Sequence, residues 1–284
     1  MGDVIVVDGE GRVRDADAPL LFADDLAALR GDGVFETILI RDRESRLVDD
    51  HLRRLGDGAR ALDLPAPDAG ALRRAIAVAE REWASPDDAC LRILYSRGRE
   101  SGGPPTCYLT VTPVPERSAI ARRDGVRVTL LPRGVEPSSA QPWELAGAKA
   151  LSYARNVAAL RHVQRSGFDD AIYVSADGLI LESPRASVVA VVDGTLTTPP
   201  RDQGILPGTT QQALFRVAAS FDVPVREARM TSSDVLAADG VWLLSSLTLA
   251  ARVAAVDTTV LPVPSAAAPD VPNLVSRAIS ERMM

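Results

Sequence analysis

The chain of 284 residues contains 46% hydrophobic and 25% charged residues and carries a formal net charge of −6 at pH 7. This is the composition of an ordinary globular protein, long enough to bury a sizeable core in one large domain or two smaller ones. The acidic balance argues against a general affinity for nucleic acid or anionic membrane, and the lack of an apolar run of about 18 residues argues against a transmembrane helix.

The first 115 residues predict a mixed unit of helices and strands. Alternating apolar residues that end at glycine-rich or charged turns indicate strands, whereas apolar residues three and four apart indicate helices. In chain order we expect a hairpin at 4–17, a strand, charged turn, return strand and helix start within 33–55, a helix at 68–85, and strands at 89–98 and 105–115. The apolar face of the first helix carries Leu52, Leu55, Ala59 and Leu62.

The segment 113–125 combines prolines with many charges, which is typical of a linker between domains. We therefore expect a small N-terminal domain at 1–115, a linker at 116–125 and a large C-terminal domain at 126–284. The second domain is predicted to contain a strand at 126–132, an amphipathic helix at 148–167, short strands within 169–200, a helix after the turn at 208–210, a strand and polar turn within 239–257, and a terminal helix at 273–284.

Residue counts exclude several kinds of chemistry. His51 and His162 are far apart and lie in no ligand-spaced motif, so we expect no metal site. The chain lacks both the G-x-S-x-G nucleophile elbow and the G-x-x-x-x-G-K-[ST] phosphate loop. The N-terminus lacks the basic and apolar regions of a signal peptide, and Cys90 and Cys107 make no disulfide framework. A cytoplasmic protein with reduced thiols is therefore expected.

Lys149, in the stretch GAKALSYARN (147–156), is the only lysine of the chain. Arginine can replace lysine as a surface charge, but its guanidinium pKa lies above about 12, so it cannot act as an amine nucleophile. The count therefore indicates amine chemistry, above all a Schiff base, with chance retention of one exposed lysine as the alternative. At the start of the predicted helix, the helix dipole and burial would both favour the neutral amine.

A carbonyl cofactor held by a lysine needs a phosphate cradle, an acid beside its ring nitrogen and a polar group near its phenolic oxygen. The Gly-Thr-Thr turn at 208–210 directly precedes a predicted helix, whose N–H groups would bind phosphate well, although a plain helix cap explains the same residues. Glu182, before a Ser-Pro turn, is a candidate acid. Arg54 offers a forked donor to phosphate, and Ser245–Ser246 supply hydroxyls.

The order of these motifs resembles the class IV aminotransferase family of pyridoxal-phosphate enzymes, which includes branched-chain and D-amino-acid aminotransferases and aminodeoxychorismate lyase. The resemblance runs through GDGVFETI (31–38), HLRRL (51–55), KALSYARN (149–156), GLILESPRASVV (178–189), GILPGTT (204–210) and WLLSSL (242–247). It implies pyridoxal 5'-phosphate as the cofactor. It also implies a two-domain α/β and α+β architecture of fold type IV, with a smaller N-terminal α/β domain and a larger, strand-rich C-terminal domain that binds the cofactor.

Carried over by position, the resemblance implies that Lys149 is the Schiff-base lysine, Glu182 the partner of the pyridine nitrogen and Arg54 the phosphate-binding arginine. Tyr153, four residues after Lys149 on the same predicted helix face, would lie near the phenolic oxygen and complete the catalytic set. The remaining phosphate contacts would come from Gly208, Thr209, Thr210 and Ser246. The family normally continues its acid as E-G-x-x-S-N, whereas this chain reads E-S-P-R-A-S.

The stretch 91–111 most resembles aminodeoxychorismate lyases. D-amino-acid aminotransferases carry an Arg-x-His carboxylate trap where this chain has Gly102 and Pro104, and branched-chain enzymes have a glycine where this chain has Thr37. The resemblance therefore implies conversion of 4-amino-4-deoxychorismate to 4-aminobenzoate and pyruvate, a step of folate biosynthesis. A class IV aminotransferase acting on D- or branched-chain amino acids, or a catalytically inactive family member serving as a binding protein, are the alternatives.

Substrate discrimination is expected from residues 30–40 and 95–105. The candidate substrate-binding residues are Phe35, Thr37, Arg97 and Arg99. The two arginines would meet the substrate carboxylates, although either could instead pair with an acid of its own domain. The resemblance further implies a homodimer that acts on a small amino substrate, with no nucleic-acid, membrane or metal partner.

Overall fold

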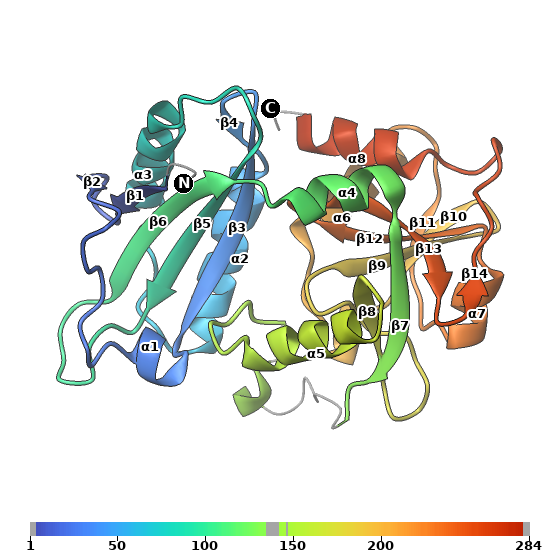
Figure 1. Cartoon of the computed structure of the whole chain (residues 1–284), viewed down its shortest axis with the longest axis horizontal. Coiled ribbons are helices and arrows are strands. Elements are labelled where there is room, and N and C mark those ends of the chain that lie inside the picture. The colour runs from blue at the N-terminus through green and yellow to red at the C-terminus, as the bar shows by residue number, and fades with distance from the viewer. Residues whose placement is uncertain (1–3, 135–141, 146, 281–284) are drawn as a thin grey trace. The chain divides into compact units, whose positions relative to one another are not determined.

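The computed structural model describes residues 4–134, 142–145 and 147–280. They form two compact units (Figure 1). Unit 1 takes its described residues from Met1–Pro115 and Ala148–Tyr153, and unit 2 from Glu116–Gly147 and Ala154–Met284. In this part of the chain no helix is both long and apolar enough to cross a bilayer.

Unit 1 is built on an antiparallel sheet with the strand order β2-β1-β6-β5-β3-β4. Its strands are β1 (Ile5–Asp8), β2 (Val13–Arg14), β3 (Gly33–Arg41), β4 (Glu44–Ser45), β5 (Ala89–Ser96) and β6 (Thr106–Pro113). Its helices are α1 (Leu26–Arg30), α2 (Val48–Ala61) and α3 (Ala69–Glu82). The predicted hairpin, the two central strands and both long helices are confirmed.

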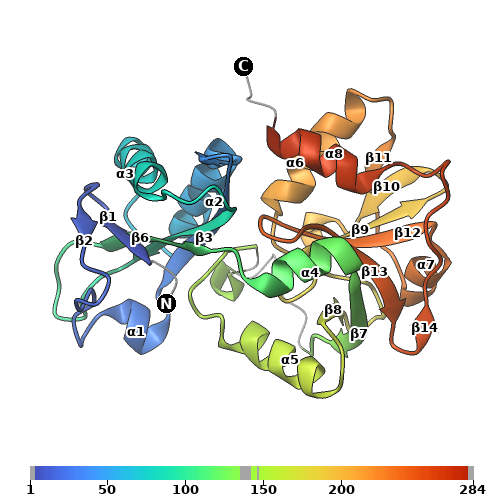
Figure 2. The same cartoon turned by 45° about the horizontal axis from the view of Figure 1, so that its top comes forward.

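The core of unit 1 lies between this sheet and the helices α2 and α3, which cover one of its faces (Figure 2). On β3 the alternating residues Val34, Ile38 and Ile40 are buried in this core, as are Leu52 and Leu55 of α2. Because successive strand residues point to opposite faces, Phe35 and Thr37 lie on the other face of β3. One face of β3 is therefore packed in the core of unit 1, and the face that carries Phe35 and Thr37 points away from that core.

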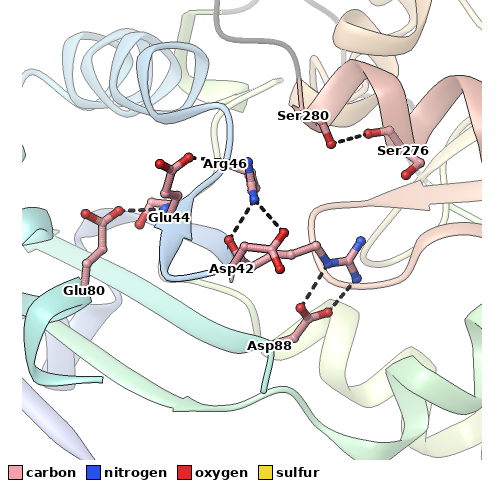
Figure 3. A network of polar contacts seen from close by, with 9 residues as sticks. Asp42, Glu44, Arg46, Glu80, Asp88, Ser276 and Ser280 are labelled. Carbon is pink, nitrogen blue, oxygen red and sulfur yellow. Dashed lines mark hydrogen bonds and ion pairs between the residues drawn. The ribbon is translucent and has the colours of Figure 1, made fainter. Parts of the chain in front are cut away.

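A network of polar contacts surrounds the β3–β4 hairpin of unit 1 (Figure 3). Arg41 donates two hydrogen bonds to Asp88, from Nε at 3.0 Å and from Nη2 at 2.6 Å. The backbone N–H of Ser45 donates to Glu80 at 2.6 Å, which joins the hairpin to α3. These bonds tie the hairpin to its neighbours at the end of β3 remote from Phe35.

The chain returns to unit 1 at residues 148–153, where we had expected the start of a helix. Instead, Ala150 bridges Val34 in antiparallel fashion, and the Leu151 N–H donates to the Gly33 carbonyl at 2.8 Å. Because these backbone groups are used in pairing with β3, they are unavailable to a helix. The helix α5 begins only at Ala154 and ends at Arg165. The prediction of a helix from residue 148 is therefore wrong.

Unit 2 contains a mixed sheet with the strand order β11-β10-β9-β12-β13-β7-β8, and β14 pairs with β13. Its strands are β7 (Val126–Pro132), β8 (Asp170–Val174), β9 (Ser187–Val192), β10 (Thr195–Thr198), β11 (Val225–Glu227), β12 (Gly240–Ser245), β13 (Leu249–Val256) and β14 (Thr259–Val260). Its remaining helices are α4 (Glu116–Asp124), α6 (Thr209–Ala219), α7 (Ser232–Ala237) and α8 (Val271–Ser280), with 3-10 turns at Pro142–Glu144 and Arg201–Gln203. Of the predicted terminal helix, 281–284 lies outside the described residues.

The segment 116–125, expected as a linker, is the helix α4 of unit 2. Its Ala121 is buried in the core of that unit, together with Val128 of β7 and Val253 of β13. Arg122 also donates from Nε to the Leu247 carbonyl at 2.7 Å. Glu116, Arg117 and Arg123 are exposed, but the segment packs into unit 2 as a helix, so the prediction of a linker here is wrong.

Candidate active site

Lys149 lies in the short segment of unit 1 that pairs with β3. The Phe35 N–H donates to the Lys149 carbonyl at 3.0 Å, which fixes the lysine backbone at the start of the strand. Its Nζ is 4.4 Å from the centre of the Phe35 ring and 5.8 Å from that of Tyr153. The two rings meet edge to face, with centroids 5.5 Å apart. The amine is therefore held beside two aromatic rings.

Tyr153 does lie near Lys149, but not for the reason we predicted. Both residues precede α5, so they share no helix face. The Tyr153 N–H donates to the Leu151 carbonyl at 2.6 Å, a tight turn that brings the ring back towards Phe35. Lys149 and Tyr153, which the sequence boundaries assigned to the large domain, both belong to unit 1.

Arg54 lies on the face of α2 that packs against β3, and only 9% of its surface is exposed. Its guanidinium donates two hydrogen bonds to Glu36, from Nε and from Nη2, each at 2.7 Å. The same carboxylate meets Nδ1 of His51 at 2.7 Å. Arg54 was predicted from the sequence, but its partner Glu36 and the contact of His51 with that carboxylate were not. The available signal was a carboxylate at a core-facing position of an otherwise apolar strand.

Glu182 lies in unit 2, in a stretch whose backbone pairs with β8. Its Oε2 accepts a hydrogen bond from the Leu206 N–H at 3.0 Å, and Oε1 is 3.6 Å from Nη1 of Arg133. The turn after it is closed by the Ser183 N–H, which donates to the Ala186 carbonyl at 2.9 Å. The sequence E-S-P-R-A-S thus makes an ordered turn. Arg133 was missed because nothing in its local sequence links it to Glu182.

The Gly-Thr-Thr turn leads directly into α6, as predicted. Gly208 is the N-cap residue, with no side-chain cap, so the first N–H groups of the helix are not satisfied by a capping side chain. A Cβ at Gly208 would lie 2.2 Å from Oγ of Ser187, so a larger residue there would require the Ser187 side chain to move. Thr209 and Thr210 are buried, and within the described part of the chain Oγ1 of Thr210 has no hydrogen-bond partner.

These donors fit a phosphate group. Uncapped N–H groups at a helix N-terminus favour an anion, and a buried hydroxyl without a partner costs free energy unless a ligand supplies one. Ser245, by contrast, is used within its own turn: its hydroxyl lies 2.5 Å from that of Thr248. Ser246, the residue that sequence analysis selected, follows β12 directly and is half-buried.

The candidate substrate residues all belong to unit 1. Phe35 and Thr37 share one face of β3. Arg97 donates to Asp32 from Nε at 2.6 Å and from Nη2 at 3.3 Å, and Nη2 also donates to the Leu62 carbonyl at 2.7 Å. Arg99 donates to Asp24 at 2.8 Å. Each arginine thus pairs with an acid of its own unit, which is the alternative that the sequence left open.

The chain belongs to the class IV aminotransferase family, whose model (Amino-transferase class IV) matches residues 33–256. It is accordingly an enzyme of fold type IV that depends on pyridoxal phosphate. Among its relatives, the bifunctional aminodeoxychorismate lyase / D-amino acid transaminase of Mycobacterium tuberculosis is 50% identical over 272 residues, covering 91% of this chain and 93% of that protein. The sequence resemblance to the family is confirmed.

Solved structures agree with this assignment. A hypothetical aminotransferase from Mycobacterium tuberculosis in a PLP-bound form has a TM-score of 0.94 and 48% identity, covering 97% of this chain and 99% of that one. The 4-amino-4-deoxychorismate lyase of Pseudomonas aeruginosa has a TM-score of 0.78 and 25% identity, covering 96% of this chain and 97% of that one. The predicted fold and cofactor are thereby confirmed, while the roles of individual residues stay predictions.

Proposed function

We propose that the chain is an aminodeoxychorismate lyase, which converts 4-amino-4-deoxychorismate to 4-aminobenzoate and pyruvate. The observation that carries the proposal is the 50% identity, over nearly the whole of both chains, to a relative named for this activity. The same relative is also named as a D-amino acid transaminase, which makes transamination of D-amino acids the second candidate activity.

Within this proposal each predicted site residue has a role towards the cofactor. Lys149 would supply the amine that attaches the cofactor, and Glu182 would hold a proton at its ring nitrogen. Tyr153 would donate to its phenolic oxygen. The residues that would bind its phosphate are Arg54, Gly208, Thr209, Thr210 and Ser246. The partnerless hydroxyl of Thr210 and the uncapped start of α6 support the phosphate assignment.

When bound, pyridoxal phosphate supplies an electron sink for the carbon that carries the substrate amine. The task of Lys149 is then to take the proton from that carbon as a general base, once its amine has been displaced by the substrate. The backbone pairing of residues 149–151 with β3 keeps the lysine close to its starting position. In the lyase reaction the bond between the ring carbon and the enolpyruvyl oxygen breaks and the ring becomes aromatic. The enolpyruvate that leaves takes up one proton on its methylene carbon, which replaces the proton lost from the ring, and so becomes pyruvate.

Glu182 is arranged to stay ionised in this scheme. Its carboxylate accepts the Leu206 N–H and lies beside the positive charge of Arg133, and both contacts favour the ionised form. An ionised carboxylate next to the ring nitrogen favours a proton on that nitrogen. Because the donor to Oε2 of Glu182 is the backbone N–H of Leu206, the orientation of the carboxylate does not depend on a movable side chain.

We also infer that the protein is a cytoplasmic homodimer that serves folate biosynthesis. Isologous dimers are the commonest oligomers, and the family resemblance implies one. Multi-angle light scattering of the holoenzyme should give a mass near twice 30.2 kDa. A fully active species of monomer mass contradicts this part of the proposal.

The test of the proposed function is a direct comparison of activities. The purified holoenzyme is given 4-amino-4-deoxychorismate and followed by 4-aminobenzoate fluorescence, beside keto-acid formation from D-alanine and from branched-chain L-amino acids. Lys149→Ala is the matched inactive control. Aminobenzoate formation with a kcat/KM well above that for any transamination supports the proposal. Transamination without aminobenzoate formation overturns it.

A further inference from the structure

Glu36 is the exception on the core-facing side of β3. Its neighbours on that side, Val34, Ile38 and Ile40, are apolar and buried in the core of unit 1. Glu36 itself has no exposed surface. A buried carboxylate is costly unless it is paired and hydrogen-bonded, so its presence in this row needs an explanation.

The carboxylate is fully engaged by two side chains of α2. Arg54 donates to Oε1 from Nε and to Oε2 from Nη2, a bidentate contact with both distances at 2.7 Å. His51, one helical turn earlier, meets Oε2 at 2.7 Å. An ionised carboxylate only accepts hydrogen bonds, so Nδ1 of His51 is the donor. Glu36 of β3 therefore holds the Arg54 guanidinium by two hydrogen bonds. His51 of α2 holds the Glu36 carboxylate by a third, and we call this contact the His51 brace.

The charges of this cluster are settled by its surroundings. Burial alone raises the pKa of the Glu36 carboxyl, but the charge of Arg54 and the hydrogen bonds from Arg54 and His51 outweigh burial and hold the pKa well below its usual value. Burial lowers the pKa of His51 more than Glu36 raises it, and Arg54 and Lys149 lower it further. The cluster therefore contains a carboxylate, a guanidinium and a neutral imidazole.

Stability alone does not account for this arrangement. Replacing a buried ion pair by apolar residues of similar volume is often neutral or stabilising, so the pair is a poor device for holding α2 on β3. What it does provide is a fixed guanidinium plane. The contact engages Nε and Nη2, and because the guanidinium is a rigid planar fork, holding these two atoms fixes the plane of the whole group.

We propose that Glu36 is a positioning residue for the cofactor phosphate: together with His51, it fixes the plane of the Arg54 guanidinium, the group that would bind that phosphate. The inference rests on the phosphate role given to Arg54 in the proposed function. Glu36 contacts neither cofactor nor substrate in this scheme; it acts through Arg54. A flexible arginine side chain loses conformational entropy when it binds phosphate, which weakens binding. An arginine side chain already held by Glu36 has lost that entropy on folding, so phosphate binding costs less.

The test compares two ligands of the apoprotein that differ only in the phosphate. Dissociation constants of pyridoxal phosphate and pyridoxal are measured by absorbance titration for the wild type, Glu36→Gln and Glu36→Asp, with circular dichroism as the check of folding. Positioning predicts that both variants weaken pyridoxal phosphate binding by at least about tenfold, the effect of one misplaced charged hydrogen bond, and leave pyridoxal binding within about twofold. Glu36→Asp is informative because it keeps the charge and withdraws the carboxylate by one methylene.

Two other outcomes overturn the inference. If Glu36 merely competes with the phosphate for positive charge, Glu36→Gln tightens pyridoxal phosphate binding and Glu36→Asp leaves it unchanged. If Glu36 is only structural, both ligands weaken together. A wild type that binds pyridoxal as tightly as pyridoxal phosphate overturns the phosphate role of Arg54 as well, which separates that failure from a failure of Glu36 alone.

Matched variants guard against loss of folding. Asp88→Asn weakens a second bidentate arginine–carboxylate pair of unit 1, the one with Arg41, and should leave the ratio of the two dissociation constants unchanged. His51→Ala removes the brace without disturbing either partner of the ion pair. It should lower the preference for the phosphorylated ligand several-fold, and His51→Asn, which can donate from a similar position, should restore it. An unchanged ratio in a folded His51→Ala protein contradicts the bracing role.

Discussion

Phe35 and Lys149 are joined twice, once through the backbone and once through their side chains. The Phe35 N–H donates to the Lys149 carbonyl at 3.0 Å, and the lysine Nζ lies 4.4 Å from the centre of the Phe35 ring. The first contact holds the backbone of the lysine and the second limits where its amine can point. The only lysine of the chain is thus anchored on a strand of the unit that also carries Arg54.

Lys149→Arg should abolish covalent attachment of the cofactor while keeping the positive charge. The guanidinium has a pKa above about 12 and does not condense with an aldehyde at neutral pH. Wild-type holoenzyme should be yellow, and borohydride reduction followed by peptide mapping should find the pyridoxyl group on Lys149. The variant should bind pyridoxal phosphate reversibly and colour only weakly. Borohydride labelling at any residue other than Lys149 in the wild type contradicts the assignment.

Glu182→Gln should retain the cofactor but lose most of the rate. The amide cannot hold a proton at the ring nitrogen as a carboxylate does, so the electron sink is weakened and kcat should fall by about 100-fold or more. Glu227→Gln, at a carboxylate of β11 that is 43% exposed, is the control and should keep wild-type kcat. An unchanged kcat in Glu182→Gln would show that the carboxylate serves only to hold Leu206 and Arg133.

Thr210→Val should weaken pyridoxal phosphate binding without destabilising the apoprotein. The Thr210 hydroxyl is buried without a partner among the described residues, so a methyl in its place leaves the apo stability unchanged or raises it. Loss of the phosphate bond should cost about 0.5–1.5 kcal/mol of binding free energy.

Thr198→Val is the matched control, because the Thr198 hydroxyl donates to the Val188 carbonyl at 2.7 Å. It should lower the melting temperature of the apoprotein and leave cofactor affinity alone. If Thr210→Val destabilises the apoprotein as much as Thr198→Val does, the Thr210 hydroxyl is bonded within the protein and has no phosphate role.

Arg97→Ala should behave as a fold variant. Its guanidinium donates to Asp32 and to the carbonyls of Leu62 and Asp63, so truncation leaves several acceptors without their donor. We expect a loss of about 1–3 kcal/mol in the free energy of unfolding by urea, with equal losses of kcat/KM for the lyase substrate and for D-alanine.

Arg99→Ala should be milder in stability. Both arginines form a partly exposed pair with an aspartate, and such pairs contribute about 0–1 kcal/mol, but only Arg97 is also seen to bond the carbonyls of Leu62 and Asp63. Arg99 is therefore the better of the two candidates for a substrate carboxylate. If Arg99 binds a substrate carboxylate, the variant loses at least about 2 kcal/mol of transition-state stabilisation with 4-amino-4-deoxychorismate and much less with D-alanine. Equal losses on both substrates assign Arg99 to the fold.

His51 should make the apoprotein less stable as the pH falls below about 6.5. Burial lowers the pKa of His51 in the folded protein, while the unfolded chain takes up this proton near pH 6.5. Between these two pKa values the unfolded state binds more protons, so the free energy of unfolding falls with falling pH, by at most about 1.4 kcal/mol per pH unit. Urea unfolding of the wild type and His51→Gln across this range should show the slope only in the wild type. Parallel curves would mean that His51 titrates alike in both states.

The sequence alone determined the family, the cofactor class and most of the regular elements. Alternation of apolar residues and turn chemistry are local properties, and they predicted β1–β2, β5, β6 and α3 correctly. The single lysine was informative for a chemical reason that needs no structure: no arginine can do what an amine does. The order of the motifs then led to the family because each is contiguous in the chain.

Only the tertiary structure decided the surroundings of these residues. Helical periodicity at 148–167 was real from Ala154 onward, but the backbone groups of Lys149–Leu151 pair with β3, a competing partner more than 100 residues away that no local pattern reveals. In the same way, the hydrogen-bonded ion pairs Arg97–Asp32 and Arg54–Glu36 join residues far apart in the sequence. Burial of the core brings their strands and helices together. Whether a buried charge is costly or useful depends on which partners packing places within hydrogen-bond distance, and that is a property of the folded chain.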